Sequence, residues 1–295
     1  MKKEGVCLKL GLALSGGGIR GIAHAGALKA LEDNGISIDV IGGTSSGALI
    51  SSLYALGYSP YYIYTLFKRY SKDMVGMNSG PIISEIKNFI TNKRLEIKGL
   101  KADNSLEEAY DRLALKKGVK TINDIKNMPL VIPAVDIGKA KEYIFTNRIP
   151  ENAEDKEQYI TDISIGKAVK ASSCFPAIFR PCEFKNHIFL DGGVLDNIPV
   201  SEVKKQGADI VIGVKFNSDE ITEDSNIMDM TMKTIDIMGG KISEENLKQA
   251  NFVLNVYTDK TGLLDTDKLD SCYKYGYNAV IENLDKIKEI ININK

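Results

Sequence analysis

The chain has 295 residues, 43% of them hydrophobic, which is enough to build one large buried core or two smaller ones. Its 38 Lys and Arg residues nearly balance its 39 Asp and Glu residues, and no dense basic cluster occurs, which argues against a nucleic-acid partner. Charges or glycines interrupt the apolar runs before they reach membrane-spanning length, so we expect no transmembrane segment.

The cysteines and the N-terminus indicate the type of compartment. The chain contains four cysteines: Cys7, Cys174, Cys182 and Cys272. They form no Cys-x-x-Cys pair, so we expect reduced thiols in a cytoplasmic protein, without a zinc site or a disulfide framework. Met1-Lys2-Lys3 and the apolar run after it imitate a signal peptide, but Glu4 and Lys9 interrupt that run. We interpret this segment as the start of the first strand.

The predicted elements begin with two strand–helix units. Residues 7–15 are apolar and end in glycines, which is typical of a buried strand, and residues 19–33 have apolar side chains at helical spacing. A second strand is predicted over 36–42, and a second helix begins near Ser45. This alternation predicts an α/β fold with a parallel sheet covered by helices on both faces.

The remaining elements are less regular. Residues 58–128 are predicted to be mainly helical, and a further helix is predicted over 162–172. Strands are predicted over 130–136, 141–146, 187–190 and 209–215. The segment 225–295 is predicted to be a helical cover, with an apolar stripe at Val280, Leu284, Ile287 and Ile291. No repeat or linker marks a boundary, so we expect one domain over residues 1–295.

A glycine-rich loop joins the first strand to the first helix. Its sequence is Gly16-Gly17-Gly18-Ile19-Arg20-Gly21, which lets backbone N–H groups approach a ligand at a helix N-terminus. The same string fits Gly-x-Gly-x-x-Gly, so a nucleotide-binding oxidoreductase is one alternative. That kind of site needs an acidic residue at the end of the next strand, but Asp39 comes too early there. The nucleotide alternative therefore lacks its second contact.

The second strand ends in a serine motif. Gly43-Thr44-Ser45-Ser46-Gly47 matches Gly-x-Ser-x-Gly at a strand-to-helix turn, which can expose a nucleophilic serine. Ser45 could instead be a simple helix N-cap. The motif follows the glycine loop by one strand–helix unit, and adjacent parallel strands bring both to the same sheet edge. This placement favours Ser45 as a nucleophile.

A serine nucleophile needs a base, and the chain has only two histidines. His24 lies within the first predicted helix, where a packing role is expected. His187 precedes Asp191 by four residues, a separation of about 13 Å along a strand, so the two cannot orient against each other. Asp191 leaves an apolar strand into Gly192-Gly193 and is the remaining candidate base, with a local turn hydrogen bond as its alternative role.

Several ordered blocks resemble the signatures of patatin-like phospholipases. The three main blocks are Ser15–Gly21, Gly43–Gly47 and Asp191–Gly193, and two further blocks are Ala171–Phe179 and Asn197–Pro199. The resemblance covers about residues 8–215, and several ordered blocks are more specific than any one of them. It implies a three-layer α/β/α fold with a mainly parallel central sheet.

The resemblance also implies a catalytic mechanism. It assigns a dyad in which Ser45 is the nucleophile and Asp191 is the proton acceptor. It implies an oxyanion hole built from amides of the glycine loop, with Gly17 and Gly18 as the foremost donors. Arg20 matches a basic position of that loop and either contacts substrate or braces the loop. The implied reaction is hydrolysis of lipid esters through an acyl-serine intermediate, without a metal or another cofactor.

The expected partner is a lipid or another acyl ester, which a cytoplasmic protein of this kind can meet at a membrane surface. A catalytically silent lipid-binding or scaffold protein of the same fold is the remaining alternative. Ser15 stands where many members of the family carry aspartate, a departure that removes no catalytic group.

Overall fold

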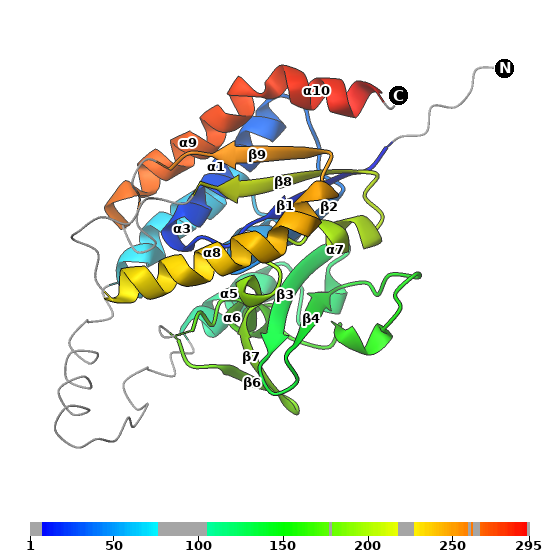
Figure 1. Ribbon diagram of the computed structural model, residues 1–295, viewed down its shortest axis with the longest axis vertical. Coiled ribbons are helices and arrows are strands. Elements are labelled where there is room, and N and C mark those ends of the chain that lie inside the picture. The colour runs from blue at the N-terminus through cyan, green and yellow to red at the C-terminus, as the bar shows by residue number, and fades with distance from the viewer. Residues whose placement is uncertain are drawn as a thin grey trace.

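The computed structural model describes residues 8–75, 105–176, 179–217, 227–258, 261 and 266–293. Within these residues, nine strands form one sheet with the order β5-β4-β3-β2-β1-β8-β9, and β7 pairs with β3 and β6 (Figure 1). The strands are β1 (Leu10–Leu14), β2 (Val40–Gly43), β3 (Leu130–Asp136), β4 (Lys141–Thr146), β5 (Tyr159–Ile160), β6 (Cys182–Phe184), β7 (His187–Asp191), β8 (Ile210–Phe216) and β9 (Phe252–Val256).

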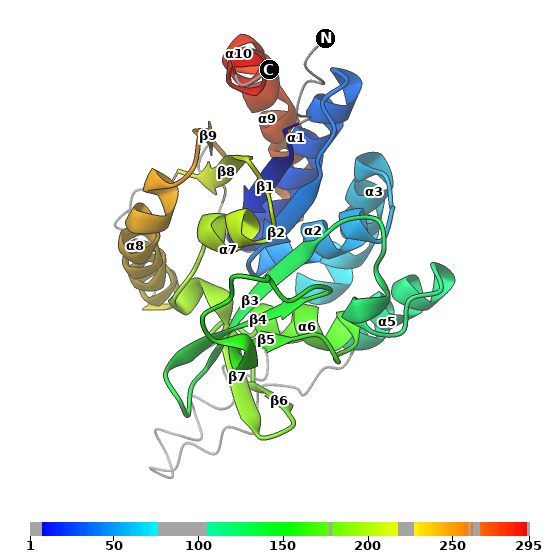
Figure 2. The same ribbon diagram turned by 90° about the vertical axis from the view of Figure 1, so that its right-hand side faces the viewer.

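Helices cover both faces of this sheet. The α-helices are α1 (Ile22–Asp33), α2 (Ser46–Ala55), α3 (Pro60–Val75), α5 (Ser105–Lys116), α6 (Ile165–Ser172), α7 (Val200–Lys205), α8 (Ile227–Lys248), α9 (Leu269–Glu282) and α10 (Leu284–Ile293). Helices α7 and α8 lie on one face, whereas α1, α2, α3 and α9 lie on the other (Figure 2). The predicted three-layer α/β/α architecture is confirmed.

Strand β1 lies at the centre of the sheet because all its residues are suited to burial. Its sequence, Leu-Gly-Leu-Ala-Leu, is buried throughout, as expected for a parallel strand with a helical layer on each face. Leu12 pairs in register with Ile41 of β2 on one side and with Ile212 of β8 on the other. The ends of β1 and β2 therefore lie at one edge of the sheet, as the order of the motifs predicts.

Strand β3 brings two other strand ends together. One of its edges pairs with β4 along residues 131–136. The opposite edge is shared: parallel β2 pairs with Leu130 and Val131, and antiparallel β7 pairs with residues 134–136. Because β2 and β7 run in opposite directions along this edge, their C-terminal ends face each other beside β3. The turns after Gly43 and after Asp191 therefore open into the same place.

Most predicted elements are confirmed, and the differences have local causes. The strands at 130–136 and 141–146 have the predicted bounds. Helix α6 begins at Ile165 instead of 162, because the hydroxyl of Ser164 accepts a hydrogen bond from Lys167 N and caps the helix. Residues 76–104, part of the segment predicted to be mainly helical, lie outside the described residues.

The segment 225–295 differs most from its prediction as a helical cover. It contains β9, an apolar run that pairs in parallel with β8. The helix predicted around the apolar stripe is two helices, because α9 ends at Glu282, with Asn283 as its C-cap, and α10 begins at Leu284. The stripe still faces inward at Val280 and Ile287, which are both buried.

Candidate active site

The glycine loop connects β1 to a short 3₁₀ helix at Gly18–Gly21. Gly18 has φ of 58°, a left-handed conformation that favours glycine. The amide of Gly16 donates to Asn197 Oδ1 at 3.0 Å, so it is already engaged. In the part of the chain that the structure describes, no protein acceptor pairs with the amides of Gly17 and Gly18. Of the predicted oxyanion donors, those of Gly17 and Gly18 are therefore better placed to serve than that of Gly16.

Arg20 braces the loop from inside the protein. Its side chain is buried, and its Nε donates to the carbonyl oxygen of Gly17 at 3.2 Å. Its Nη1 lies 3.5 Å from the carbonyl oxygen of Asn217, and its guanidinium carbon lies 5.8 Å from the centre of the Phe216 ring. These contacts tie the loop to the end of β8, which favours the bracing role among the two predicted for this residue.

Ser45 occupies a strained turn between β2 and α2. Its φ of 54° and ψ of −118° are unusual for a residue with a side chain, and such strain often accompanies functional sites. The flanking glycines are required, because a Cβ on Gly43 would lie 2.3 Å from Gly47 O and one on Gly47 would lie 2.4 Å from Leu14 O. Ser45 stands at the N-cap position of α2, yet its hydroxyl makes no capping hydrogen bond. This geometry favours the nucleophile over the simple N-cap.

The backbone of Ser45 is held by another buried serine. Ser172, near the end of α6, is completely buried, and its Oγ accepts a hydrogen bond from Ser45 N at 3.1 Å. The sequence places Ser172 in a block that resembles the family, but only the fold shows that it contacts the turn of the predicted nucleophile. Sequence reasoning did not identify this contact.

We expect Ser172→Ala to lower kcat about ten-fold while leaving KM nearly unchanged. The alanine removes the acceptor of Ser45 N–H, so the turn can relax, and one lost buried hydrogen bond corresponds to about that factor in rate. Steady-state kinetics on a short-chain ester measure both constants. Ser173→Ala is the matched control, since Ser173 adjoins Ser172 but its hydroxyl has no hydrogen-bond partner among the described residues. Equal losses in both variants would contradict the positioning role.

Asp191 is the last residue of β7 and is buried. Its Oδ1 accepts a hydrogen bond from Gly193 N at 2.8 Å, so the predicted local turn bond is present. Its own amide donates to Cys174 O at 3.1 Å, which fixes the strand end. The turn packs tightly beside the serine motif, because a Cβ on Gly192 would lie 2.4 Å from Pro133 O and 3.0 Å from Thr44 Cγ2.

Further contacts join the three blocks. The hydroxyl of Thr44 donates to the carbonyl oxygen of Asp196 at 2.8 Å, which links the serine turn to the segment after Asp191. A Cβ on Gly16 would lie 3.2 Å from the Cβ of Ser45, so the glycine loop also borders the predicted nucleophile. The predicted site residues, distant in sequence, thus converge where the ends of β1, β2 and β7 meet.

The two histidines are engaged elsewhere. His24 is fully buried, with its Nε2 2.8 Å from the carbonyl oxygen of Ser15, and burial lowers its pKa to about 4 although that hydrogen bond opposes the change. His187 places its Nδ1 2.6 Å from Asp136 Oδ2 and stacks on Phe189. Both have the contacts of structural residues.

A second carboxyl group close to the site was missed in the sequence. Asp196 is buried, and its Oδ1 accepts hydrogen bonds from Ile198 N and Asn246 Nδ2. Burial raises its pKa from 3.8 to about 7, and the nearby carboxylate of Glu202 adds to the rise, while the hydrogen bond from Asn246 opposes it. The signal available in the sequence was only its position five residues after Asp191.

The wild-type protein is expected to lose stability as pH rises, and Asp196→Asn should reduce this loss. Because the pKa is raised on folding, the native state binds more protons than the unfolded state between pH about 4 and about 7, so Asp196 lowers the free energy of unfolding as pH rises through that window. The asparagine retains the acceptor oxygen without the charge. Urea unfolding at pH 5 and at pH 8 measures the free energy of unfolding. Between these two pH values, that free energy should fall further in the wild type than in Asp196→Asn, by on the order of 2 kcal/mol. Parallel pH profiles would contradict this.

Two classes of feature are absent from the described part of the chain. It contains no group of three or more His, Cys, Asp or Glu residues placed to hold a metal ion. No described helix is both long and apolar enough to cross a membrane.

Comparison with known proteins identifies the family. Residues 12–204 match the sequence profile of the patatin-like phospholipases. The chain belongs to this family. A patatin-like phospholipase domain is a lipid acyl hydrolase domain, so the chain carries the domain of a lipid ester hydrolase, as the motifs predict. The nucleotide alternative also fails on geometry, since Asp39 accepts a hydrogen bond from Leu10 N at the opposite end of β1 from the glycine loop.

Curated relatives of this patatin-like chain include yeast lysophospholipases. The chain is 32% identical over 216 residues to "Lysophospholipase NTE1" of Scheffersomyces stipitis, a match that covers 71% of this chain and 12% of that protein. It is 28% identical over 213 residues to the protein of the same name from Saccharomyces cerevisiae, a match that covers 71% of this chain and 11% of that protein. The matches thus span only 11% to 12% of the length of these relatives.

Solved structures share the fold at low sequence identity. VipD from Legionella pneumophila aligns with a TM-score of 0.53 and 14% identity, covering 95% of this chain and 67% of that one. ExoU of Pseudomonas aeruginosa, in its complex with SpcU, aligns with a TM-score of 0.51 and 19% identity. This alignment covers 95% of this chain and 52% of the ExoU chain. These likenesses concern the fold alone.

Proposed function

We propose that this protein hydrolyses carboxylic esters of lipids with Ser45 as nucleophile and Asp191 as its base. The observation that carries the proposal is the head-on approach of β2 and β7 along one edge of β3, which opens both turns into the same place. The strained backbone of Ser45 and its hydroxyl, which makes no capping bond, support the same assignment. We also propose that residues 1–295 form one domain.

The proposed reaction proceeds in two steps. Asp191 accepts the proton of Ser45 Oγ as that oxygen attacks the ester carbonyl, and amides of Gly17 and Gly18 donate to the developing oxyanion. The alcohol leaves with the proton from Asp191, and an acyl-serine remains. Asp191 then takes a proton from water as the water attacks the acyl-serine, and returning it to Ser45 Oγ releases the fatty acid.

The substrate class follows from the relatives' names. The matched proteins are named lysophospholipases, so we propose single-chain phospholipids as the first substrates to test. We further propose that this protein is cytoplasmic and that it meets such lipids at a membrane surface. Exposed rings on α3, where Tyr61 is 58% exposed, suit the interface of a membrane.

Covalent labelling with an alkyl fluorophosphonate tests the proposed nucleophile without knowledge of the natural substrate. We expect the wild-type protein to gain one phosphonyl group, and mass spectrometry of its peptides to place that group on Ser45. Hydrolysis of lysophosphatidylcholine is measured alongside. A label on a different serine, or a folded protein that neither reacts with the probe nor hydrolyses any ester, would contradict the proposal and favour a silent lipid-binding protein.

A further inference from the structure

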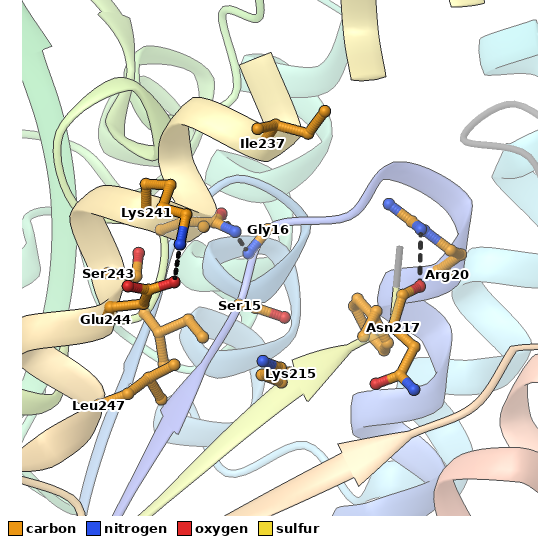
Figure 3. Close-up of a pocket in the computed structure, with 14 residues that line it drawn as sticks. Ser15, Gly16, Arg20, Lys215, Asn217, Ile237, Lys241, Ser243, Glu244 and Leu247 are labelled. Atoms are coloured by element: carbon orange, nitrogen blue, oxygen red, sulfur yellow. Dashed lines mark hydrogen bonds and ion pairs between the residues drawn. The ribbon is translucent and has the colours of Figure 1, made fainter. Parts of the chain in front are cut away.

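The side chain of Asn197 connects two of the blocks that form the site. Its Oδ1 accepts a hydrogen bond from Gly16 N at 3.0 Å, which is the dashed line at the Gly16 amide in Figure 3. The backbone oxygen of Asn197 lies 3.3 Å from the same nitrogen. Asn197 therefore provides both acceptors for the first glycine amide of the loop.

The same side-chain oxygen borders the predicted nucleophile and the predicted base. A Cβ on Gly16 would lie 2.6 Å from Asn197 Oδ1 and 3.2 Å from Ser45 Cβ, so these two atoms flank one point. A Cβ on Gly193 would lie 3.2 Å from Asn197 Oδ1 and 3.0 Å from Asp191 Oδ1. Gly193 is also the residue whose amide donates to Asp191 Oδ1. The carboxamide oxygen of Asn197 is thus a neighbour of all three parts of the site.

The segment that carries Asn197 is held on both sides. The amide of Asp196 donates to Gly192 O at 2.8 Å, and the carbonyl oxygen of Asp196 accepts the hydrogen bond from the Thr44 hydroxyl. Ile198 is buried, and its amide donates to Asp196 Oδ1 at 3.3 Å. The side chain of Asn197 therefore projects from a fixed backbone, which lets its oxygen define the position of the glycine loop.

The position of Gly16 determines where the next two amides lie. Gly17 and Gly18, the proposed oxyanion donors, follow Gly16 directly, so a displacement of Gly16 moves both relative to Ser45. The ring of Phe216 supports the loop at the next position, since a Cβ on Gly17 would lie 2.5 Å from Phe216 Cδ2. Oxyanion donors are effective only within about 2.7–3.1 Å of the developing charge, so a small displacement is costly.

We propose that Asn197 is a positioning residue for ester hydrolysis, whose side-chain oxygen holds the glycine loop at the distance from Ser45 that the oxyanion amides require. This role rests on the proposed function, because it assumes that Ser45 attacks the ester. The oxyanion forms only during that attack, so the anchor acts on the transition state and not on the bound ester. Loss of the anchor should therefore lower kcat and leave KM nearly unchanged.

Asn197→Ala removes the side-chain acceptor and leaves the backbone acceptor in place. We expect kcat on a short-chain p-nitrophenyl ester to fall at least about ten-fold, the factor that one lost buried hydrogen bond supplies. Affinity for an alkyl trifluoromethyl ketone, which serine captures as a tetrahedral adduct, should weaken by the same factor. Affinity for an ether analogue of lysophosphatidylcholine, which has no carbonyl, should not change. Labelling with a fluorophosphonate counts the active sites, so partial unfolding does not imitate these effects.

Asn251→Ala is the matched control. Asn251 Oδ1 accepts a hydrogen bond from Val211 N at 2.9 Å, which is the same kind of bond at the opposite end of β8 from Phe216. Its loss should lower the free energy of unfolding, as measured with urea, without changing kcat per active site. A structural bond and a positioning bond are thereby distinguished.

Gly16→Ala disrupts the same contact from the other side, because its Cβ would come within 2.6 Å of Asn197 Oδ1. We expect it to lower kcat at least about ten-fold as well. Since both substitutions remove one shared contact, the double variant with Asn197→Ala should lose little more than Gly16→Ala alone. If Asn197→Ala does not fold, Gly16→Ala gives the same readouts with the asparagine present.

The outcomes separate this role from the proposed function. Ester hydrolysis that is absent from the wild type, or that persists in Ser45→Ala, overturns the proposed function and this role with it. Where hydrolysis depends on Ser45, three results overturn the role of Asn197 alone. These are an unchanged kcat in the folded Asn197→Ala variant, an equal loss in Asn251→Ala, and losses that multiply fully in the double variant.

Discussion

Ser45→Ala is expected to lower kcat for ester hydrolysis by at least about 1,000-fold, because removal of a serine nucleophile leaves only the contributions of binding and of the oxyanion hole. The substitution deletes a hydroxyl that makes no capping bond, so the fold should be retained. Hydrolysis of a short-chain p-nitrophenyl ester and of lysophosphatidylcholine measures the effect. Both activities should be lost together, since one nucleophile serves both substrates.

Ser46→Ala is the matched control for this substitution. Ser46 is the next residue, and its buried Oγ has no hydrogen-bond partner in the described part of the chain. Its alanine variant should retain nearly full activity. If Ser45→Ala kept wild-type turnover, the assignment of Ser45 as the nucleophile would be wrong. If only Ser46→Ala were inactive, the nucleophile would be Ser46.

The sequence predicted those features of the site that depend on residues close together along the chain. Gly43 and Gly47 stand on either side of Ser45 because a Cβ at either position would lie within 2.5 Å of a backbone oxygen, so a short motif is enough to reveal the tight turn. Strand β1 could be predicted because a strand buried on both faces is apolar throughout. The ordered strand–helix units then placed the glycine loop and Ser45 at one sheet edge, as the register of β1 and β2 confirms.

Contacts that depend on strand pairing could not be predicted in the same way. The antiparallel approach of β7 to β3 decides where Asp191 lies, yet β7 carries no signal for the direction of its partner. The hydrogen bond between Ser45 N and Ser172 Oγ spans 127 positions, and the bond between Thr44 and Asp196 spans 152. Strand β9 was missed because a five-residue apolar run is ambiguous until a partner strand such as β8 is known.

Asp191→Asn is expected to lower kcat by about 1,000-fold or more while the protein remains folded. The asparagine can still accept the hydrogen bond from Gly193 N through its side-chain oxygen, so the turn after β7 keeps its geometry. An amide cannot accept the Ser45 proton at neutral pH, so the nucleophile stays inactive. KM should change little, because Asp191 acts on the proton and not on the bound lipid. Kinetics on the same two esters, with circular dichroism as a check on folding, measure this.

Asp196→Asn makes this test specific for the base, because it changes another buried carboxyl group of the same segment. With its pKa near 7, Asp196 is already largely protonated below neutral pH, and the neutral asparagine resembles that form. The Asp196→Asn variant should therefore keep its activity at pH 6, where Asp191→Asn is expected to show the large loss of kcat. An active Asp191→Asn combined with an inactive Asp196→Asn would transfer the role of base to Asp196, whose carbonyl oxygen already holds Thr44 beside the nucleophile. If both variants lowered kcat only slightly and equally, the base would instead have to come from outside the segment that contains Asp191 and Asp196.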